Sequence, residues 1–407
     1  MKEKIEFYEA LKLIRDSNVE SLGRERVFLH DALGRILADD ICAVSNMPQV
    51  PLSSMDGYAI SSKFKDYTEF VILDDNPAGK DIIPSIPLEN PVAIKTFTGA
   101  AMPNNADILV PIENVEVIGN KIKILKCSEI GAFIRNIGVN YTKGEKLISK
   151  GTRLNANYIG LLASLNCVFV NVYEKPKVGI LVSGDEILEI GEQSNLENVI
   201  YNANGHLLYA KVKEYGGVPK LYPILKDNKE LIEESLKDAL VNCDLVISTG
   251  GVSVGDYDFI SKIAEERKDE VIFKGVKIKP GQHVLYARFI DKYFFGLPGF
   301  PNATLVTFEL FVSEVLLKLC GCVKHKVTLK VPLGIDLQKS DERLEFRVCN
   351  VANKDGEFCI NFEGKKDFLS AILNNFCPLL PCKVGLVALN KERYSKDEIV
   401  EVILIGG

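Results

Sequence analysis

The sequence predicts a multidomain α/β protein: a doubly wound parallel sheet with a mostly helical framework, an inserted β-rich lobe and a C-terminal β-barrel. Three observations support this. After Pro176, apolar strands alternate with helical segments, as in parallel sheets with right-handed crossovers. Between residues 46 and 145, short apolar runs are broken by Pro, Gly and Asn, which is typical of a small β module. Beyond residue 323, apolar and polar residues alternate with period two.

The framework is expected to be helical because apolar residues recur at helical spacing near the start of the chain. Ile5, Tyr8, Leu11 and Ile14 share one side of such a helix, and VFLHDALGRILADDI carries a second apolar stripe. GTRLNANYIGLLASLN returns to helix after the β-rich stretch, so that stretch is inserted into the framework. The expected domains are 1–45 plus 146–175, 46–145, 176–322 and 323–407.

The block after Pro176 supplies the elements of the parallel sheet. KVGILV, PKLYPIL, CDLVIST and KYFFG have strand character, and NKELIEESLKDALVN has helical character. NANGHLLYAKVKEYGG begins with Asn and ends with Gly, as helices commonly do. Ligands of such sheets bind beyond the carboxyl ends of the strands. The loops SGDE, STGGVSVGD and LPGFPNAT follow three of these strands and are therefore expected to form the site.

The composition of the chain argues against several classes of function. The 407 residues carry a formal net charge of −6, which argues against nucleic-acid binding, since that usually needs a basic face. The amino terminus does not resemble an export signal, and the uncharged run 154–173 is interrupted by Asn and Ser. We therefore expect a cytoplasmic protein that does not bind membranes. The ten cysteines include no C-x-x-C pair and the four histidines are far apart, so structural zinc is not expected.

The stretch STGGVSVGD has the composition of an anion-binding turn. Gly250 and Gly251 allow backbone N–H groups to turn toward an anion, while Thr249 and Ser253 add hydroxyl donors. The lysine of a P-loop is absent, and so is G-x-G-x-x-G. The residues alone fit a phosphate or molybdate site and a plain strand-to-helix turn about equally well.

Acidic and basic residues near these loops suggest a metal and an anion together. Glu186 and Asp258 could hold Mg²⁺ beside a phosphate, whereas Asp256 fits a helix cap better. Lys279, followed by Pro-Gly, could be held at the site or could be an ordinary exposed lysine. Asp56-Gly57 is a hairpin turn signal and, by itself, indicates only a turn.

Several phrases, taken in order, resemble one family. They are ALGRILADD, SSMDGYAI, TFTGAAMPNNADILVPIENV, ILVSGDEI, STGGVSVGDYDF, IKPG and LPGFP. Together they resemble the molybdopterin molybdenumtransferases of the MoeA type, relatives of the E domain of gephyrin. The resemblance implies a homodimer of four subdomains, of which the α/β one binds molybdopterin. It also implies insertion of molybdenum from molybdate into adenylylated molybdopterin, which a molybdopterin adenylyltransferase supplies, with Mg²⁺-assisted release of AMP.

The resemblance also implies site residues. The implied catalytic group is Asp56, Glu186, Asp227, Asp258 and Lys279. Of these, Glu186, Asp227 and Asp258 are the implied metal ligands. The implied molybdopterin, nucleotide and oxyanion contacts are Ser183, Gly184, Thr249, Gly250, Gly251, Ser253, Pro298, Pro301, Arg135, Asn140, Arg343 and Ser370.

Four positions depart from the family's phrases. Asn140 stands where an acidic residue is usual, Gln282 and His283 replace the Lys-Pro of PGKP, and Phe300 replaces the Asn of LPGNP. An amide cannot act as a base or a charged ligand. These departures leave open a tungstate-preferring variant and a non-catalytic molybdopterin-binding or scaffold paralogue. An adenylyltransferase is a third reading, which the inserted lobe and the C-terminal β domain disfavour.

Overall fold

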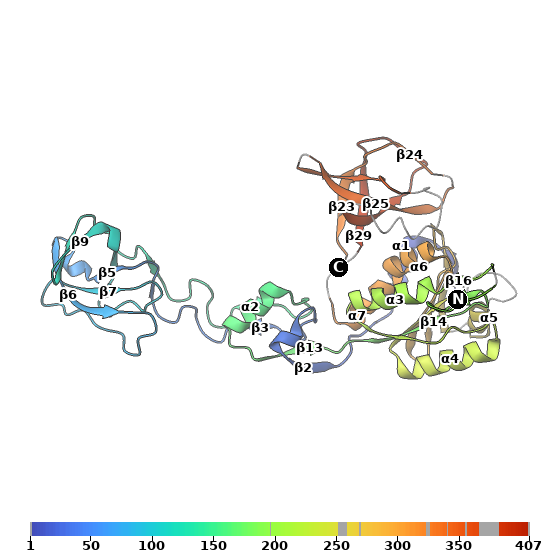
Figure 1. Cartoon of the computed structure of the whole chain (residues 1–407), viewed down its shortest axis with the longest axis horizontal. Helices are drawn as coiled ribbons and strands as arrows, with labels where there is room; N and C mark the ends of the chain where they lie inside the picture. Colours follow the sequence, from blue (N-terminus) through green and yellow to red (C-terminus); the bar gives the residue numbers. More distant parts are fainter. Residues whose placement is uncertain are drawn as a thin grey trace. The chain divides into compact units, whose positions relative to one another are not determined.

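The computed structural model describes residues 2–195, 197–250, 259–267, 270–322, 326–339, 341–354, 356–365 and 382–405. The chain forms two compact units. Figure 1 colours the chain by its position in the sequence. The first combines Met1–Asp39 with Lys150–Gly407, and the second is Asp40–Ser149. The second unit is thus an insertion, because chain segments on both sides of it belong to the first.

The first unit contains a seven-stranded sheet in the order β1-β19-β21-β22-β18-β14-β17. Its strands are β1 (Lys2–Ile5), β14 (Lys177–Val182), β17 (Val218–Leu221), β18 (Leu245–Thr249), β19 (Val271–Val276), β21 (Leu285–Phe289) and β22 (Lys292–Leu297). The strands β17, β14, β18 and β22 are mutually parallel, as predicted. The predicted parallel arrangement does not extend to β21, which is antiparallel to both of its neighbours.

The antiparallel step comes from a tight hairpin between β21 and β22. Ile290 and Asp291 connect the two strands with positive φ angles of 49° and 61°. Positive φ at both central residues is the geometry of a type I′ turn, whose twist matches that of paired strands. Ile-Asp lacks the Asn-Gly or Asp-Gly signature of such turns, so local sequence patterns do not predict this hairpin.

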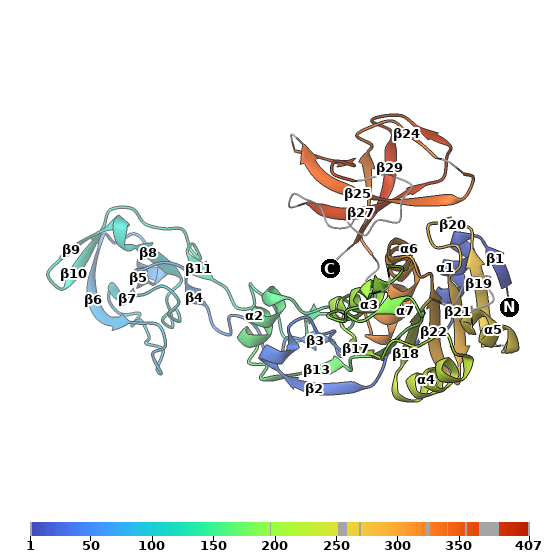
Figure 2. The same cartoon turned by 45° about the vertical axis from the view of Figure 1, so that its right-hand side comes forward.

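Helices cover both faces of this sheet (Figure 2). One face packs against α1 (Phe7–Asp16), α3 (Ala203–Glu214), α6 (Pro301–Thr307) and α7 (Ser313–Leu319), and the other against α4 (Lys229–Asn242) and α5 (Phe259–Glu266). A π-helical segment, Phe308–Val312, joins α6 to α7. Within β14, Ile180 faces the first group of helices and Leu181 the second, so period-two alternation buries both faces of the strand.

The amino-terminal segment is less helical than predicted. Residues before Phe7 form β1, which pairs in parallel with β19, and Tyr8 is 69% exposed instead of lying on the apolar side. The predicted helix across VFLHDALGRILADDI is replaced by β2 (Arg24–Phe28), a short 3₁₀ turn and β3 (Ile41–Cys42). Pairing of β2 with β13 (Phe169–Tyr173) satisfies the backbone there and overrides the helical apolar pattern. The predicted helix after residue 150 is confirmed as α2 (Ala156–Ser164), capped by Asn155.

The second unit is β-rich, with a six-stranded sheet in the order β8-β5-β7-β6-β10-β9. The strands are β5 (Gly57–Ile60), β6 (Glu69–Asn76), β7 (Val92–Thr96), β8 (Ile108–Pro111), β9 (Val115–Ile118) and β10 (Lys121–Ile124). Two short pairs complete it, β4 (Leu52–Ser53) with β11 (Ile134–Arg135) and β3 with β12 (Lys146–Ile148). This content agrees with the Pro-, Gly- and Asn-broken apolar runs of the sequence.

The C-terminal part is also built of strands. They are β23 (Thr328–Pro332), β24 (Leu337–Gln338), β25 (Leu344–Lys354), β26 (Glu357–Asn361), β27 (Lys383–Leu389), β28 (Arg393–Tyr394) and β29 (Ile399–Ile405). The short strand β20 (Ile278–Lys279) pairs with β25, so backbone hydrogen bonds join this sheet to the α/β part. Closure of these strands into a barrel stays a prediction. None of the described helices is both long and apolar enough to cross a membrane.

Candidate functional site

The candidate site lies where the order of the strands reverses. From β14 the chain passes through α3 to β17 on one side, and then through α4 to β18 on the other side of β14. Such a switch opens a crevice at the carboxyl ends of the two central strands. The strands β14, β18 and β22 are neighbours, so the three loops singled out in the sequence begin side by side.

These loops border a cavity of about 520 Å³. Its walls come from the ends of β14, β18 and β22, from the start of α3, and from the two-stranded pair β15 (Ile187–Leu188) and β16 (Ile200–Tyr201). The lining residues are Val182, Ser183, Glu186, Ile187, Ile200, Tyr201, Asn202, Ala203, Asn204, Thr249, Gly250, His283, Pro298, Gly299, Phe300 and Pro301.

Six of the predicted site residues meet in this cavity. They are Ser183, Glu186, Thr249, Gly250, Pro298 and Pro301. Gly184, Asp227, Lys279 and Arg343 belong to the same unit but do not line it. Four further predicted residues, Gly251, Ser253, Asp258 and Ser370, lie outside the described residues.

Several groups predicted to bind an anion already hold the loops to one another. Ser183 donates its backbone N–H to Thr249 O at 3.3 Å, and Gly184 donates to Leu225 O at 3.1 Å. The Thr249 hydroxyl donates to Pro298 O at 3.2 Å. In the described part of these loops, such groups therefore fix the shape of the cavity.

Gly250 is required by close packing as well as by its backbone conformation. Its φ is +91°, and a Cβ atom there would lie 2.6 Å from Ser183 O. Any other L residue would be strained at this φ and would also push the loops after β14 and β18 apart. The glycine that the sequence marked for anion binding thus also sets the distance between two walls.

Asn204 joins the walls from the start of α3. Its Nδ2 donates to Thr249 Oγ1 at 3.0 Å and to Gly299 O at 2.7 Å. The carbonyl of Gly299 can only accept, which fixes the orientation of the Asn204 amide. Asn204 Oδ1 is buried and has no hydrogen-bond partner among the described residues.

Carboxylates gather at the β14 side of the cavity. Glu186 folds back over Gly184, where a Cβ atom would lie 2.7 Å from Glu186 Oε2. Asp185 Oδ1 accepts from the backbone N–H of Asp227 at 3.4 Å, which brings the second predicted metal ligand to the same loop. No group of three or more His, Cys, Asp or Glu side chains within the described ranges is arranged for a metal ion.

A second hydrogen-bonded group, formed by Glu189, Asn202 and His206, connects the segment just after Glu186 to the start of α3. His206 Nε2 and Glu189 Oε1 are 2.6 Å apart, and Asn202 Nδ2 donates to Glu189 Oε2 at 3.1 Å. The bond to His206, more than any other contact, lowers the pKa of the Glu189 carboxyl. The carboxylate is therefore ionised and holds β15 against α3.

The predicted basic residues form a chain beside the cavity. Arg343 donates to both carboxylate oxygens of Asp341, at 3.3 and 2.7 Å, and to Gln282 Oε1 at 2.6 Å. Gln282 Nε2 lies 2.7 Å from His283 Nε2, and His283 lines the cavity. Lys279 Nζ is 3.5 Å from Asp341. The hydrogen bonds from Arg343 lower the pKa of Asp341 to about 2.

Three predicted residues belong to the inserted unit. Asp56 is exposed in the turn before β5, and its Oδ1 accepts from the backbone and hydroxyl of Thr98 at 2.7 and 2.8 Å. Those two bonds lower the pKa of the Asp56 carboxyl. Arg135 donates to Asn140 Oδ1 at 2.7 Å, so these two predicted residues lie together.

Sequence reasoning missed much of the apolar wall. Ile200 and Tyr201 belong to a short strand that follows a polar stretch, and no apolar run marked them. Asn204 lies in a predicted helix, and no pattern marks it as a site residue. Phe300 and His283 depart from the family's phrases, but no residue pattern places their side chains at the cavity.

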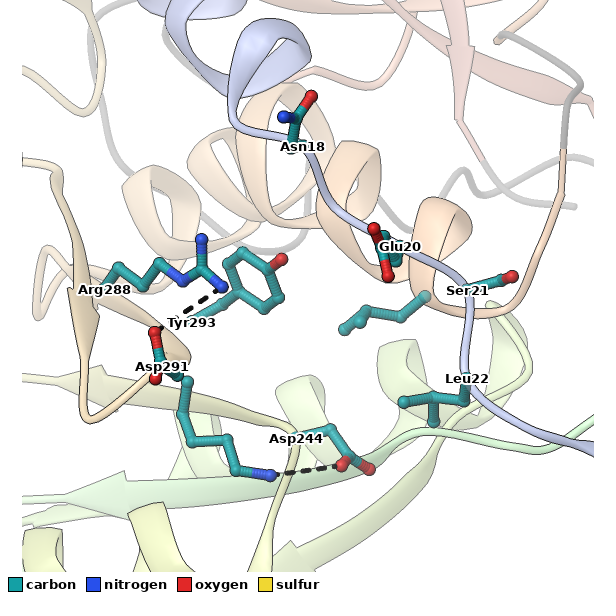
Figure 3. A pocket seen from close by; sticks show the side chains of 10 residues that line it. Asn18, Glu20, Ser21, Leu22, Asp244, Arg288, Asp291 and Tyr293 are labelled. Carbon is teal, nitrogen blue, oxygen red and sulfur yellow. Dashed lines mark ion pairs between the residues drawn. The ribbon is translucent and has the colours of Figure 1, made fainter.

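A second cavity of about 400 Å³ lies at the opposite ends of the strands, where β18 and β22 begin (Figure 3). Four of its charged side chains form two ion pairs. Arg288 Nη2 is 3.7 Å from Asp291 Oδ1, and Lys292 Nζ is 3.6 Å from Asp244 Oδ1. Of the predicted site residues that the structure describes, none lines this second cavity.

Comparison with known sequences covers most of the chain. Residues 5–166 match the MoeA N-terminal region (domain I and II), and residues 179–318 match a probable molybdopterin binding domain. The chain is 36% identical over 330 residues to a molybdopterin molybdenumtransferase of Nostoc sp., a match that covers 78% of this chain and 75% of the relative. It is 31% identical over 388 residues to a putative molybdopterin biosynthesis protein of Methanocaldococcus jannaschii, covering 94% and 92%.

A solved structure is similar over the same length. The crystal structure of the molybdopterin biosynthesis MoeA protein from Pyrococcus horikoshii superimposes with a TM-score of 0.82 at 28% identity. The match covers 99% of this chain and 100% of that chain. The second matched region, residues 179–318, contains every residue that lines the larger cavity.

Proposed function

Because this chain belongs to the MoeA family of molybdopterin molybdenumtransferases, we propose that it inserts molybdenum from molybdate into adenylylated molybdopterin and releases AMP. The chain is an enzyme of molybdenum cofactor biosynthesis. One observation carries the proposed site: three loops from neighbouring strands enclose a single cavity at the switch point of the sheet.

The residues of the cavity fit a substrate with an anionic end and a flat end. Thr249 and Gly250 border the part proposed for phosphate, and Pro298 and Pro301 form the adjacent wall. Lys279 and Arg343, which do not line the cavity, are proposed to supply positive charge for the oxyanion from beside it, and Asp341 pairs with both of them. Asp56, Arg135, Asn140, Gly251, Ser253, Asp258 and Ser370 remain proposed site residues from the resemblance alone.

Magnesium suits the acidic side by its donor chemistry. Glu186 and Asp227 offer hard carboxylate oxygens, and Mg²⁺ is usually held by one or two carboxylates together with phosphate oxygens and water. When bound, it would offset the charge that develops on the pyrophosphate as AMP leaves. The described residues orient the substrate around it, because the neighbours Asp185 and Glu186 limit the position of the phosphates.

The localisation, the oligomeric state and the upstream partner of the enzyme are proposed from the same resemblance. We expect a cytoplasmic homodimer of four-subdomain chains with a closed C-terminal barrel. It would receive its substrate from a molybdopterin adenylyltransferase.

The test measures AMP release from adenylylated molybdopterin by the full chain with Mg²⁺ and molybdate, without ATP. We expect turnover with the wild type and about 100-fold less with Glu186→Gln, which keeps the shape but removes the charge. Glu357→Gln, which changes an exposed carboxylate of β26, should leave the rate unchanged. Tight substrate binding without AMP release would support the scaffold reading, and a need for ATP would support the adenylyltransferase. Tungstate in place of molybdate settles the oxyanion preference.

A further inference from the structure

Phe300 presents its ring to solvent at the mouth of the cavity. The residue lines the cavity and is 73% exposed. This exposure does not reflect a loose backbone, because Phe300 O accepts from Thr304 N at 2.9 Å and from Thr304 Oγ1 at 3.1 Å. The preceding carbonyl, Gly299 O, accepts from Asn204. The backbone that carries the ring is therefore held in place, while the ring itself is exposed.

The wall formed by β16 carries two more exposed apolar side chains. Ile200 is 58% exposed and Tyr201 is 57% exposed, and both line the same cavity. The Tyr201 hydroxyl donates to Glu192 O at 3.3 Å, so the polar end of this ring is bound to the protein. Several large, exposed apolar side chains at one concave site usually indicate a binding surface.

We propose that Phe300 is a positioning residue that stacks on a flat nitrogen heterocycle of the substrate, a proposal that rests on the proposed function. Stacking on an aromatic face is favourable for any such ring and needs no matched hydrogen bonds. The proposed substrate has two rings of this kind, the pterin and the adenine of its adenylyl group. Both share the chemistry that Phe300 would recognise, so the ligands used in the test must separate them.

The chemistry of the side chain limits what Phe300 can do at the cavity. A phenylalanine side chain has an aromatic face and no hydrogen-bonding group, so its contact with a ligand is apolar packing or stacking.

The test uses the intrinsic fluorescence of a free pterin titrated with the full chain. The chain contains no tryptophan, so the pterin can be followed with little competing protein signal. We expect quenching and saturable binding with the wild type and about ten-fold weaker binding with Phe300→Leu, which keeps apolar volume but removes the aromatic face. Phe300→Tyr should restore binding. Phe358→Leu changes an exposed phenylalanine of β26 and is the matched control.

AMP binding by calorimetry identifies which ring is stacked. A loss confined to pterin assigns Phe300 to the pterin, and a loss confined to AMP assigns it to the adenine. Equal affinities of wild type and Phe300→Leu for both ligands would overturn the inference. The wild-type AMP-release assay is run on the same preparation, so a failure of the proposed function appears there and not in the comparison of Phe300 variants.

Discussion

Asn204 and Gly299 are joined by a hydrogen bond of 2.7 Å that ties the start of α3 to the loop after β22. The two residues are far apart in sequence, and the bond closes one wall of the cavity. The same Asn204 amide also donates to Thr249, at the end of a third element. The candidate site therefore depends on one side chain that sequence patterns did not single out.

Replacing Asn204 by Ala should lower the free energy of unfolding by about 1–3 kcal/mol, because it leaves the Gly299 carbonyl without its donor in a buried wall. Urea unfolding of the full chain measures this change. Asn242→Ala removes an exposed asparagine with two local hydrogen bonds and should cost about 0.5 kcal/mol or less. Equal losses in the two variants would show that Asn204 does not join the loops.

Replacing Gly250 by Ala should destabilise the protein more than replacing Gly191 by Ala. Both glycines have positive φ, +91° and +87°, so each substitution carries about 1–2 kcal/mol of backbone strain. Only Gly250 has a backbone oxygen, Ser183 O, at 2.6 Å from the added Cβ, whereas nothing lies within 4 Å at Gly191. We expect AMP release to fall with Gly250→Ala alone. Matching unfolding curves for the two variants would contradict the close-packing argument.

The pKa of Asp341 should rise by about one unit or more when Arg343 is replaced by Ala, and by less when Lys279 is replaced by Ala. The guanidinium makes the direct hydrogen bonds that lower this pKa to about 2, while Lys279 contributes the weakest effect. Because the folded pKa is lowered, the stability gained is present above the unfolded value of about 3.9 and is lost as the pH falls toward 2. Carboxyl-carbon NMR titration of the variants measures the shift, and a larger effect from Lys279 would refute the assignment.

Glu309→Gln should cost about 3–5 kcal/mol of unfolding free energy. Glu309 is fully buried in the π-helical segment and contacts Lys211 at 2.8 Å, Lys326 at 3.4 Å and the Tyr215 hydroxyl at 2.6 Å. Burial raises the pKa of Glu309, but the two lysines outweigh it and the net shift is downward. The glutamine would leave two ammonium groups without this partner. Glu214→Gln removes only the more exposed partner of Lys211 and should cost about 1 kcal/mol or less.

Much of the α/β part could be predicted, because its strands are buried on both faces and its helices carry capping residues. The predicted helix of NANGHLLYAKVKEYGG is α3, and Asn202 accepts from Gly205 N at its start. The loops after β14, β18 and β22 lie together as expected, since parallel strands place their ends at one edge. Local pattern was sufficient there because propensity and tertiary packing agree.

Other features depended on contacts between distant residues, which no local pattern contains. The local pattern of β2 predicts a helix, but the segment forms a strand because it pairs with β13, more than 100 residues away in the sequence. The Ile290–Asp291 hairpin lacks the usual turn residues, so the antiparallel strand β21 was unforeseen. At the site, Asn204 and Phe300 gain their positions from α3 and from the loop after β22, which meet only in the folded chain.

The short strand β1 has a consequence for association between molecules. It covers the backbone of β19, which would otherwise offer unpaired N–H and C=O groups to a second chain. The new outer edge is only four residues long and carries Lys2, Glu3 and Lys4. Lys4 has a φ of +47°, which interrupts the regular extended backbone. A brief, charged and distorted border of this kind is a poor template for further strands, so this side of the sheet is protected against aggregation.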